Sequence, residues 1–572
     1  MKHLILTIIC NFVVLATIAQ SIDTVQLGQS TTAIFQTFDH PSSPGIAVTV
    51  LKDGRPITKK KYGMANLEHS IPFTHKSPVR LLYSMGREFM SIGLVLMETD
   101  GLLSFDDKVR NYFPKLPEWS KDVTIRDLIN HSSGFNDEWS LLLLMTADMR
   151  SNIEEEQVLS LLYNQPQPQV EPGKGYMYNN TDFALLRLIM EMAAEKSLID
   201  YLNEKVFTPL GMSSTFMNDD IEALIPGFAE NYYGYKTFRK ARFIKHSPGG
   251  NYRIVTTADD LQKWAMAIND TSSAISKGFS RLYKNTRPIP VLQSERHYTF
   301  GHVFGTINGT EIIYHGGVEE SYYLIRIPAK QISVIGLGNG LNFYSPIVHL
   351  AHSLFPPEQD AQERRYFPQG QVLLNKEDMV KYTGRYFAQD VGYNSHIPSI
   401  EFYDLKLEGD KLNFYAKLAA EGFPITSFGN GYFKDLDDDT MMQFIEGEPD
   451  SVMKLKIWQE GRNKSKIFIR EESKVNFTKD YLQQFIGKYY SPHLDYYFSI
   501  VMNEKGQLIL KRPTVPNTYM EPTSEERFLI EQKNGGYSTF VRMIFTKNEK
   551  DEVDGFSLQY SRLMHHRFEK VQ

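Results

Sequence analysis

A serine stands directly ahead of an apolar helical pattern in the N-terminal half of the chain. The segment Leu82-Tyr83-Ser84-Met85-Gly86-Arg87-Glu88 precedes residues Phe89 to Met97, whose apolar side chains recur at helical spacing. A hydroxyl at the head of a buried helix can act as a nucleophile, because nearby backbone N–H groups and the helix dipole favour developing negative charge. Serine is also a common helix N-cap, and Ser84 taken alone favours that structural interpretation.

Two further polar segments follow Ser84 between elements of regular structure. Tyr178-Asn179-Asn180-Thr181 follows a Pro-Gly loop and precedes an apolar helical pattern. His315-Gly316-Gly317 stands between a strand pattern at 311–314 and another at 322–327. A lone histidine is most simply a core residue, but the two glycines after it, between two strands, favour a functional site.

In this order, and with Asn130–Phe135 and Pro248–Tyr252 between them, the segments resemble the serine β-lactamase and penicillin-binding-protein superfamily. The branch they resemble most is that of the class C enzymes, esterases and D-aminopeptidases, and the resemblance covers about Pro41 to Leu354. It implies an α/β (α+β) fold of the β-lactamase-like transpeptidase type. In that fold an antiparallel sheet is flanked by an all-helical lobe, and the active site lies in the cleft between them.

The family has three motifs, Ser-x-x-Lys, Tyr-x-Asn and Lys/His-x-Gly, and the resemblance assigns a role to each matching residue. Ser84 would be the acylated nucleophile, Tyr178 the general base or acid, and Asn180 a residue that orients the substrate or the base. A base in this role requires the hydroxyls of Ser84 and Tyr178 to lie within about 3 Å of each other.

The third motif would bind substrate along a strand edge. It consists of His315, Gly316 and Gly317. The resemblance also implies an oxyanion hole formed by the backbone N–H of Ser84 together with that of Val318 or Glu319.

The first motif departs from the family pattern, because Arg87 stands three residues after Ser84 where the family has lysine. A lysine there can lose its proton and accept that of the serine, whereas an arginine keeps its proton in any protein setting. Two interpretations follow. Either Tyr178 is the only base and the charge of Arg87 favours its tyrosinate form, or the site is a relic in which Ser84 is an ordinary buried hydroxyl.

The surrounding elements fit an enzyme-sized α+β domain. Gly45–Leu51 reads as a buried strand, and Asp53-Gly54 gives the hairpin signal after it. Thr124 with Asp127 and, later, Thr257 mark helix starts. Strands and helices alternating over some 330 residues predict one domain at 20–354.

The C-terminal third is predicted to be all-β. A proline-bearing, charged linker at 355–370 precedes segments of short alternating strands. Tyr382-Thr383-Gly384-Arg385-Tyr386 resembles Phe485-Ile486-Gly487-Lys488-Tyr489, and each precedes a hairpin with a glycine at its turn, Gly409 or Gly506. We expect two small β-barrel or β-meander modules, at 371–474 and 475–572, with one larger β-domain as the alternative.

The N-terminus predicts export. A basic start, an apolar run from Leu4 to Ile18 and small residues at its end describe a signal peptide at 1–19, and the alternative is a membrane anchor. The apolar run is shorter than the about 20 residues that span a bilayer, so we expect no stable membrane insertion after cleavage. The protein would be secreted or periplasmic, and Cys10, its single cysteine, lies within the removed segment.

The composition narrows the function classes. With a net charge of −6, the chain has no basic footprint for nucleic acid. No metal-ligand spacing and no cofactor motif emerges. The prediction is an exported serine hydrolase that acts on a small-molecule or peptide substrate by acyl transfer to Ser84, with peptidase or esterase activity favoured over β-lactamase activity. The alternative is a catalytically impaired binding protein. The sequence leaves the oligomeric state open.

Overall fold

The computed structural model of the protein describes most of the chain beyond residue 21, so the expected signal peptide lies outside the described residues. The described ranges are 22–81, 83–145, 155–218, 223–235, 237–241, 254–285, 289–290, 297–307, 309–316, 322–340, 343–355, 367–368, 370–388, 400–416, 422–436, 440–446, 452–459, 465–472, 475–534, 537–560 and 562–571. Most of the expected linker, and the segment Pro248–Tyr252, lie outside these ranges. The residue limits of the expected domains stay predictions.

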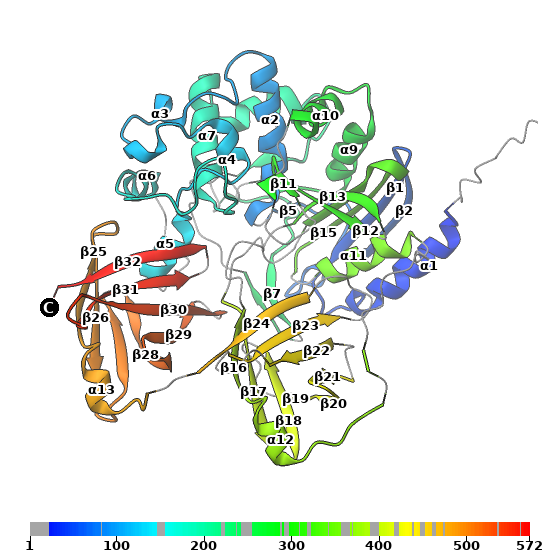
Figure 1. Ribbon diagram of the computed structural model, residues 1–572. Coiled ribbons are helices and arrows are strands. Elements are labelled where there is room, and N and C mark those ends of the chain that lie inside the picture. Colours follow the sequence, from blue (N-terminus) through cyan, green and yellow to red (C-terminus); the bar gives the residue numbers. More distant parts are fainter. Residues whose placement is uncertain are drawn as a thin grey trace, which may run out of the picture.

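An eight-stranded antiparallel sheet organises the N-terminal part, with the strand order β10-β11-β12-β13-β14-β15-β1-β2 (Figure 1). Its strands are β1 (Ile46–Lys52), β2 (Arg55–Tyr62), β10 (Ile289–Pro290), β11 (His297–Thr299), β12 (His302–Ile307), β13 (Thr310–Gly316), β14 (Tyr322–Ile327) and β15 (Ile332–Gly338). The expected hairpin turn is confirmed, since Asp53 and Gly54 both have positive φ between β1 and β2.

Helices cover both faces of this sheet, because its central strands are apolar on both sides. Alternate residues of β1 belong to different cores: Ile46, Val48 and Val50 pack in one, and Ala47 and Leu51 in the other. Helices α1 (Thr24–Phe35) and α11 (Tyr344–Ser353) contribute to the first core, and α9 (Ala258–Asn269) contributes to the second.

The remaining helices of this part form a lobe beside the sheet. They are α2 (Arg87–Thr99), α3 (Val109–Tyr112), α4 (Ile125–Ile129), α5 (Glu138–Met145), α6 (Glu155–Tyr163), α7 (Thr181–Ala194), α8 (Leu198–Leu202) and α10 (Ala274–Asn285). The expected N-caps are confirmed, because Thr124 forms a capping box with Asp127 at α4 and Thr257 caps α9. No helix within the described ranges is both long and apolar enough to cross a membrane.

Short strands form small sheets separate from the eight-stranded sheet. They are β3 (Met64–Asn66), β4 (Ile71–Pro72), β5 (Val79–Arg80), β6 (Phe216–Met217), β7 (Tyr232–Tyr235), β8 (Thr237–Lys240) and β9 (Ile254–Thr256). The expected α+β arrangement with a helical lobe is therefore confirmed.

The C-terminal third is all-β, as expected, and it forms two separate sheets rather than one larger β-domain. The first, a nine-stranded sheet, has the order β19-β18-β17-β16-β24-β23-β22-β21-β20. Its two edge strands follow each other in the chain with only Ile425 between them, so the sheet curls until its edges nearly meet. Its strands are β16 (Gly384–Ala388), β17 (Phe402–Glu408), β18 (Lys411–Ala416), β19 (Phe423–Pro424), β20 (Thr426–Gly429), β21 (Tyr432–Lys434), β22 (Thr440–Ile445), β23 (Lys454–Gln459) and β24 (Ser465–Glu471).

The second sheet, the C-terminal barrel, is a closed barrel of eight strands. Closure pairs β25 with β32, so that no strand edge is left open. Its strands are β25 (Gly487–Ser491), β26 (Tyr496–Met502), β27 (Leu508–Arg512), β28 (Val515–Ser524), β29 (Arg527–Asn534), β30 (Tyr537–Lys547), β31 (Val553–Tyr560) and β32 (Leu563–Lys570).

The repeated motif marks the same structural position in both sheets. Each copy follows a short helix, α12 (Lys376–Val380) or α13 (Lys479–Gln483), and opens the first strand of its sheet. The Tyr386 hydroxyl donates to the Tyr382 carbonyl at 2.9 Å, and the Tyr489 hydroxyl donates to the Phe485 carbonyl at 2.7 Å. The two sheets therefore begin in the same way, with a buried tyrosine that ties the first strand to the turn after the preceding helix.

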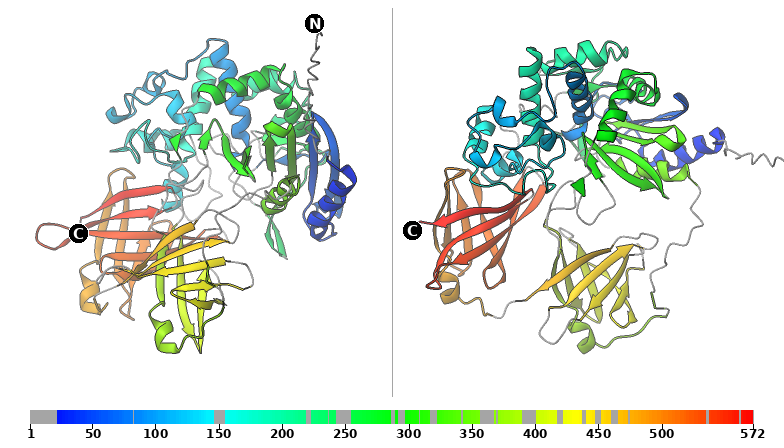
Figure 2. Two further views of the ribbon diagram at one scale, coloured as in Figure 1. Left: turned by 45° about the vertical axis from the view of Figure 1, so that its right-hand side comes forward. Right: turned by 45° about the horizontal axis from the view of Figure 1, so that its top comes forward.

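The C-terminal barrel lies against the helical lobe and beside the nine-stranded sheet (Figures 1 and 2). Leu141 and Leu144 of α5 pack in the same apolar core as the barrel strands. The contacts at the seam between the two sheets include the ion pair of Arg385 with Glu521 at 2.9 Å, the ion pair of Arg542 with Glu471, and the rings of Phe402 and Phe540, whose centroids lie 5.0 Å apart.

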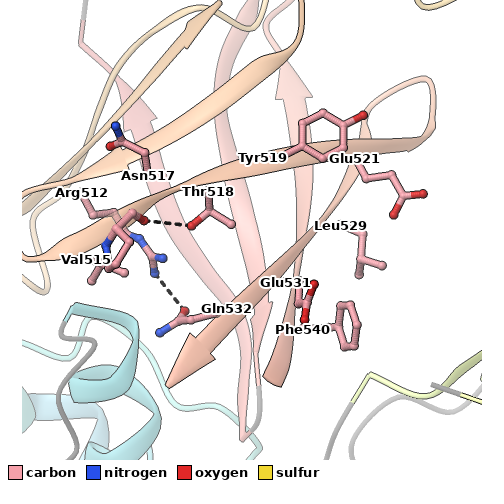
Figure 3. Close-up of a pocket in the computed structure, with 11 residues that line it drawn as sticks. Arg512, Val515, Asn517, Thr518, Tyr519, Glu521, Leu529, Glu531, Gln532 and Phe540 are labelled. Atoms are coloured by element: carbon pink, nitrogen blue, oxygen red, sulfur yellow. Dashed lines mark hydrogen bonds between the residues drawn. The ribbon is translucent and has the colours of Figure 1, made fainter. Parts of the chain in front are cut away.

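A pocket of about 390 Å³ opens along this side of the barrel (Figure 3). Glu521 and Phe540 of the sheet-to-sheet seam line it, together with Arg512, which donates to Gln532 at 2.9 Å. The pocket therefore lies where the barrel meets its neighbours, and it does not include the serine identified from the sequence.

Candidate active site

Ser84 lies in a turn of 3₁₀-helix, Tyr83–Gly86, that leads directly into α2. The helix begins at Arg87, two residues before the apolar pattern suggested. Strand β13 runs beside this turn, and the backbone at Gly301 approaches so closely that a Cβ there would stand 3.1 Å from the Arg87 carbonyl. Gly301 has φ of +70°, so glycine suits both the tight turn and the close approach.

The hydroxyls of Ser84 and Tyr178 are in direct contact. Tyr178 Oη donates to Ser84 Oγ at 2.6 Å, which is within the reach that a nucleophile and its base need. Both side chains are buried, with exposed fractions of 5% and 3%. Tyr178 and Asn180 reach this position because the chain enters α7 at Thr181 directly after them.

Arg87 occupies the place of the expected lysine and is fully buried. Its Nη2 donates to Asn180 Oδ1 at 2.6 Å, and its guanidinium carbon lies 4.4 Å from the centroid of the Tyr178 ring and 4.5 Å from that of Phe183. Burial opposes the charge, but Tyr178, Tyr298 and a nearby carboxyl raise the pKa of Arg87 above its usual value. Arg87 therefore stays protonated and is a cation in contact with the phenol.

A second side of Arg87 is held by a buried histidine that the sequence did not single out for the site. Arg87 Nη1 lies 3.2 Å from His131 Nε2, and His131 Nδ1 lies 2.9 Å from Asp182 Oδ2. Because arginine can only donate, His131 Nε2 must accept, and its proton must sit on Nδ1 and point to Asp182. His131 is thus held as the neutral Nδ1–H tautomer by its two partners.

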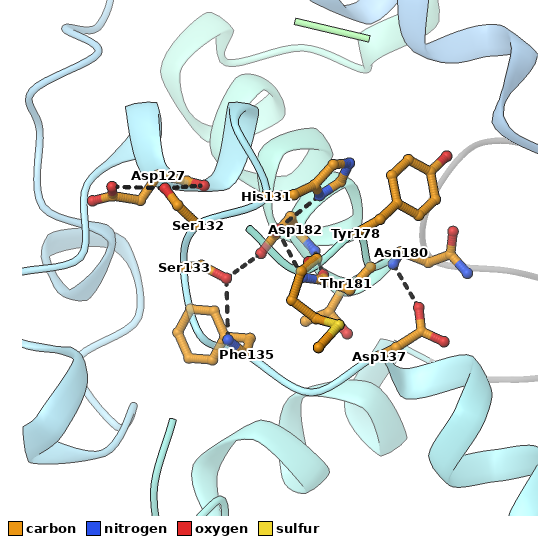
Figure 4. A network of polar contacts seen from close by, with 12 residues as sticks. Asp127, His131, Ser132, Ser133, Phe135, Asp137, Tyr178, Asn180, Thr181 and Asp182 are labelled. Atoms are coloured by element: carbon orange, nitrogen blue, oxygen red, sulfur yellow. Dashed lines mark hydrogen bonds and ion pairs between the residues drawn. The ribbon is translucent and has the colours of Figure 1, made fainter. Parts of the chain in front are cut away.

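Asp182 anchors this chain of contacts (Figure 4). Ser133 Oγ donates to its Oδ1 at 2.5 Å, and Asn179 Nδ2 donates to its Oδ2 at 2.8 Å. Burial raises the pKa of the Asp182 carboxyl well above its usual range, while these hydrogen bonds and the charge of Arg87 act against the rise. The orientation of Arg87 therefore depends on residues from α7 and from the segment after α4.

Two carboxyls at the start of α5 complete the surroundings. Asp137 Oδ1 accepts from the backbone N–H of Asn180 at 2.7 Å (Figure 4). Glu138 accepts from Thr181 Oγ1 at 2.6 Å. Burial, followed by the charge of Asp137, raises the pKa of Glu138 to about 8, so this carboxyl is largely protonated at neutral pH.

The third motif lies on the sheet side of the site. His315 and Gly316 are part of β13, where the sequence pattern ended the strand at residue 314. His315 is buried, and its ring centroid lies 6.1 Å from that of Tyr298, which also packs on Tyr178. Gly317, Val318 and Glu319 lie outside the described residues, so the second oxyanion-hole donor stays a prediction.

Sequence reasoning brought together Ser84, Arg87, Tyr178 and Asn180, and it missed the residues that support them. Asp182 had a usable signal, because an acid in the first turn of an apolar helix must be paired if it is buried. The sequence gives no comparable signal for Arg562 of the barrel, whose guanidinium carbon lies 4.8 Å from the Tyr178 ring centroid. Among the described residues no group of three or more His, Cys, Asp or Glu side chains is arranged to hold a metal ion.

The comparisons with known proteins agree with this geometry. The family model described as Beta-lactamase matches residues 31–349, more than half of the chain. The chain therefore belongs to the beta-lactamase family of serine hydrolases, and its N-terminal part has the β-lactamase and transpeptidase fold that the sequence implied.

Its relatives within the family include peptidases. Penicillin-binding protein 4* of Bacillus subtilis strain 168 is 29% identical over 384 residues, which cover 62% of this chain and 82% of the relative. A D-aminopeptidase of Gluconobacter oxydans strain 621H is 25% identical over 308 residues, 52% of this chain and 56% of the relative. The chain thus spans about half the length of the D-aminopeptidases that it matches.

Solved structures share the fold at lower identity. An octameric penicillin-binding protein homologue from Pyrococcus abyssi aligns with a TM-score of 0.53 at 19% identity, covering 78% of this chain and all of that one. EstCE1, a hydrolase with promiscuous acyltransferase activity, aligns with a TM-score of 0.50 at 20% identity, covering 58% of this chain.

Proposed function

We propose that the protein is an exported serine hydrolase that cleaves an amide, peptide or ester bond through an acyl-enzyme on Ser84, with Tyr178 as the general base. The observation that carries the proposal is the 2.6 Å contact between the two hydroxyls, next to the buried cation of Arg87. A buried cation favours the anionic form of a neighbouring phenol, and a phenolate is a base strong enough to take the proton of a serine.

The steps follow from these contacts. The Tyr178 phenolate accepts the Ser84 proton while Oγ attacks the carbonyl carbon, and the resulting oxyanion lies against the backbone N–H of Ser84. When the bond to the leaving group breaks, Tyr178 returns the proton to it. Water then attacks the ester with Tyr178 again as base, which frees the acid and restores the serine.

The substrate class is argued from the relatives. Among them are D-aminopeptidases and a penicillin-binding protein, and this chain has a serine, a tyrosine and an asparagine that match the family's motif pattern. Together with the two C-terminal β sheets, this favours peptidase or esterase activity over hydrolysis of β-lactams. Export is supported by the pattern of residues 1–19.

The test is labelling with a fluorophosphonate probe, followed by intact-mass spectrometry. Wild type should gain one adduct, and Ser84→Ala should gain none. Tyr178→Phe should label about 10²–10⁴-fold more slowly, which is the usual value of general-base assistance. A folded wild-type protein that gains no adduct at high probe concentration would refute the proposal.

A non-catalytic binding protein is the second candidate, and the observation in its favour is that Arg87 binds Asn180 and cannot serve as a base. The variant Arg87→Lys separates the two. A lysine cannot contact both His131 and Asn180 in the planar geometry of a guanidinium, so an enzyme adapted to Arg87 should label no faster than wild type. A gain of labelling in the lysine variant would instead identify a relic site.

A further inference from the structure

A turn of the C-terminal barrel reaches the candidate active site. Arg562 lies between β31 and β32, is 7% exposed, and its guanidinium carbon lies 4.8 Å from the centroid of the Tyr178 ring. Its Nη1 lies 3.1 Å from Asp137 Oδ1, and its backbone N–H donates to Ser140 Oγ at 3.3 Å. The ring of Tyr178 is therefore in contact with a cation, Arg562, from a module that begins some 300 residues later in the chain.

We propose that Arg562 is a positioning residue for Tyr178 and Asn180, and that the C-terminal barrel is consequently part of the active site. The inference rests on the proposed role of Tyr178 as the base. Arg562 would act through Tyr178 and Asp137 and would not itself contact the reacting bond.

Asp137 carries the effect from Arg562 to the second motif. Its Oδ1 accepts from both Arg562 Nη1 and the backbone N–H of Asn180. Its Oδ2 accepts from the backbone N–H and the hydroxyl of Ser140, at 3.0 and 2.7 Å, at the start of α5. The carboxylate is 1% exposed, so without Arg562 it would lose the only ion-pair partner shown for it among the described residues.

The barrel also holds the other end of α5. Arg512 Nη1 donates to the Leu144 carbonyl at 3.1 Å, and Gln532 Nε2 donates to the Leu143 carbonyl at 2.6 Å. Carbonyls in the last turn of a helix lack intrahelical partners, and a cation there is favoured by the helix dipole. Since the barrel binds both ends of α5, the placement of Asp137 depends on the barrel.

Tyr178 is surrounded by charged and titratable groups from several elements. From the N-terminal part these groups include the guanidinium of Arg87, 4.4 Å from the ring centroid, and the neutral ring of His131. The barrel adds the second cation, Arg562. The groups that contact Tyr178 are Ser84, Arg87, His131, Tyr298 and Arg562, and Tyr176 lies close enough to interact electrostatically. Three carboxyls lie one residue further out, where Asp137 binds Asn180, Glu138 binds Thr181 and Asp182 binds His131. Without Arg562 the surroundings of Tyr178 lose a positive charge while the carboxyls remain. This change disfavours the anionic, phenolate form of Tyr178.

The first test measures Ser84 labelling by the fluorophosphonate probe as a function of pH. Arg562→Gln should label about tenfold more slowly at neutral pH, with the acid limb of its profile moved to higher pH, because the variant lacks the cation 4.8 Å from the Tyr178 ring. Arg562→Lys should recover part of the loss, since it keeps the charge without the planar fork. Arg567→Gln, in strand β32 that follows Arg562 and paired with Asp554 in a solvent-accessible ion pair, should match wild type.

A second test does not require catalysis. With 3-fluorotyrosine incorporated at position 178, the fluorine resonance reports ionisation of that phenol directly. Its midpoint should move to higher pH in Arg562→Gln, which lacks the nearby cation, and stay unchanged in Arg567→Gln. If Arg562→Gln does not fold, the fluorine titration is measured in Arg562→Lys instead. Its midpoint should shift in the same direction by a smaller amount.

The outcomes separate this inference from the proposed function. A wild-type protein that does not label refutes the proposed function, and the fluorine titration then still decides the role of Arg562. A labelled wild type with Arg562→Gln unchanged in both pH profile and fluorine midpoint would overturn the inference and leave Arg562 as a packing residue.

Discussion

The two C-terminal β sheets start from the same local design and differ in what they touch. In each, a short helix leads into a first strand whose tyrosine donates to a backbone carbonyl four residues back. The C-terminal barrel shares an apolar core with α5 and sends Arg562 to Tyr178. The described ion pairs that leave the nine-stranded sheet run to the barrel, through Arg385 and through Glu471 with Arg542.

The difference shows that a repeated module can keep its internal packing while its surface takes on a new role. The hydrogen bonds that the two copies share lie inside each copy, at Tyr386 and Tyr489. The contacts that distinguish them lie in turns and strand ends, such as Arg562 and Arg512. Such positions tolerate change without disturbing a core, which is why loops on a rigid scaffold so often carry function.

The largest expected difference between the two sheets concerns the rate of Ser84 labelling after one buried leucine beside or within each sheet is truncated. Leu144→Ala, at the seam between α5 and the barrel, and Leu412→Ala, in the nine-stranded sheet, should each cost about 2–5 kcal/mol of unfolding free energy. Only Leu144→Ala should also slow Ser84 labelling, by about 10–100-fold, because a displaced α5 moves Asp137. Denaturant titration and labelling rates measure both. Equal labelling in the two variants would contradict the comparison.

The pH dependence of the unfolding free energy should report on Glu138, the buried carboxyl at the start of α5. Burial raises the pKa of Glu138 to about 8, above its value of 4.5 when exposed, so the unfolded chain releases this proton first. Stability from this group is complete below pH 4.5 and is lost as the pH rises toward 8. Between pH 5 and 7, wild type should lose about 2–3 kcal/mol relative to Glu138→Gln, as measured by urea unfolding at each pH. The exposed Asp410→Asn serves as the control and should leave the profile of wild type unchanged.

The smallest effect is expected at the seam between the two sheets. Arg385→Met keeps an apolar stem against Phe402 but removes the ion pairs with Asp404 and Glu521, at a cost of about 1–3 kcal/mol. Labelling of Ser84 should stay within twofold of wild type, because this seam lies outside the contacts of Tyr178. A large loss of labelling would mean that the nine-stranded sheet supports the site through the barrel.

Local sequence patterns were sufficient for much of the fold. The capping box at Thr124, the hairpin at Asp53-Gly54 and the repeated motif before β16 and β25 each depend on residues within a few positions of one another. The order of the three motifs was sufficient for the family. Helix α2 began two residues earlier than its apolar pattern suggested, because Arg87 and Glu88 are buried although charged.

Arg87 and Glu88 show where local sequence patterns were no longer sufficient to predict the structure. A buried charge is stable only through partners, and the partners of Arg87 come from two distant segments, one with His131 and one with Tyr178 and Asn180. The sequence by itself determined that Ser84, Tyr178 and an unusual arginine belong together. Only the tertiary structure decided that His131 and Asp182 hold that arginine and that a barrel turn adds Arg562, because contacts between segments hundreds of residues apart leave no periodic trace in the chain.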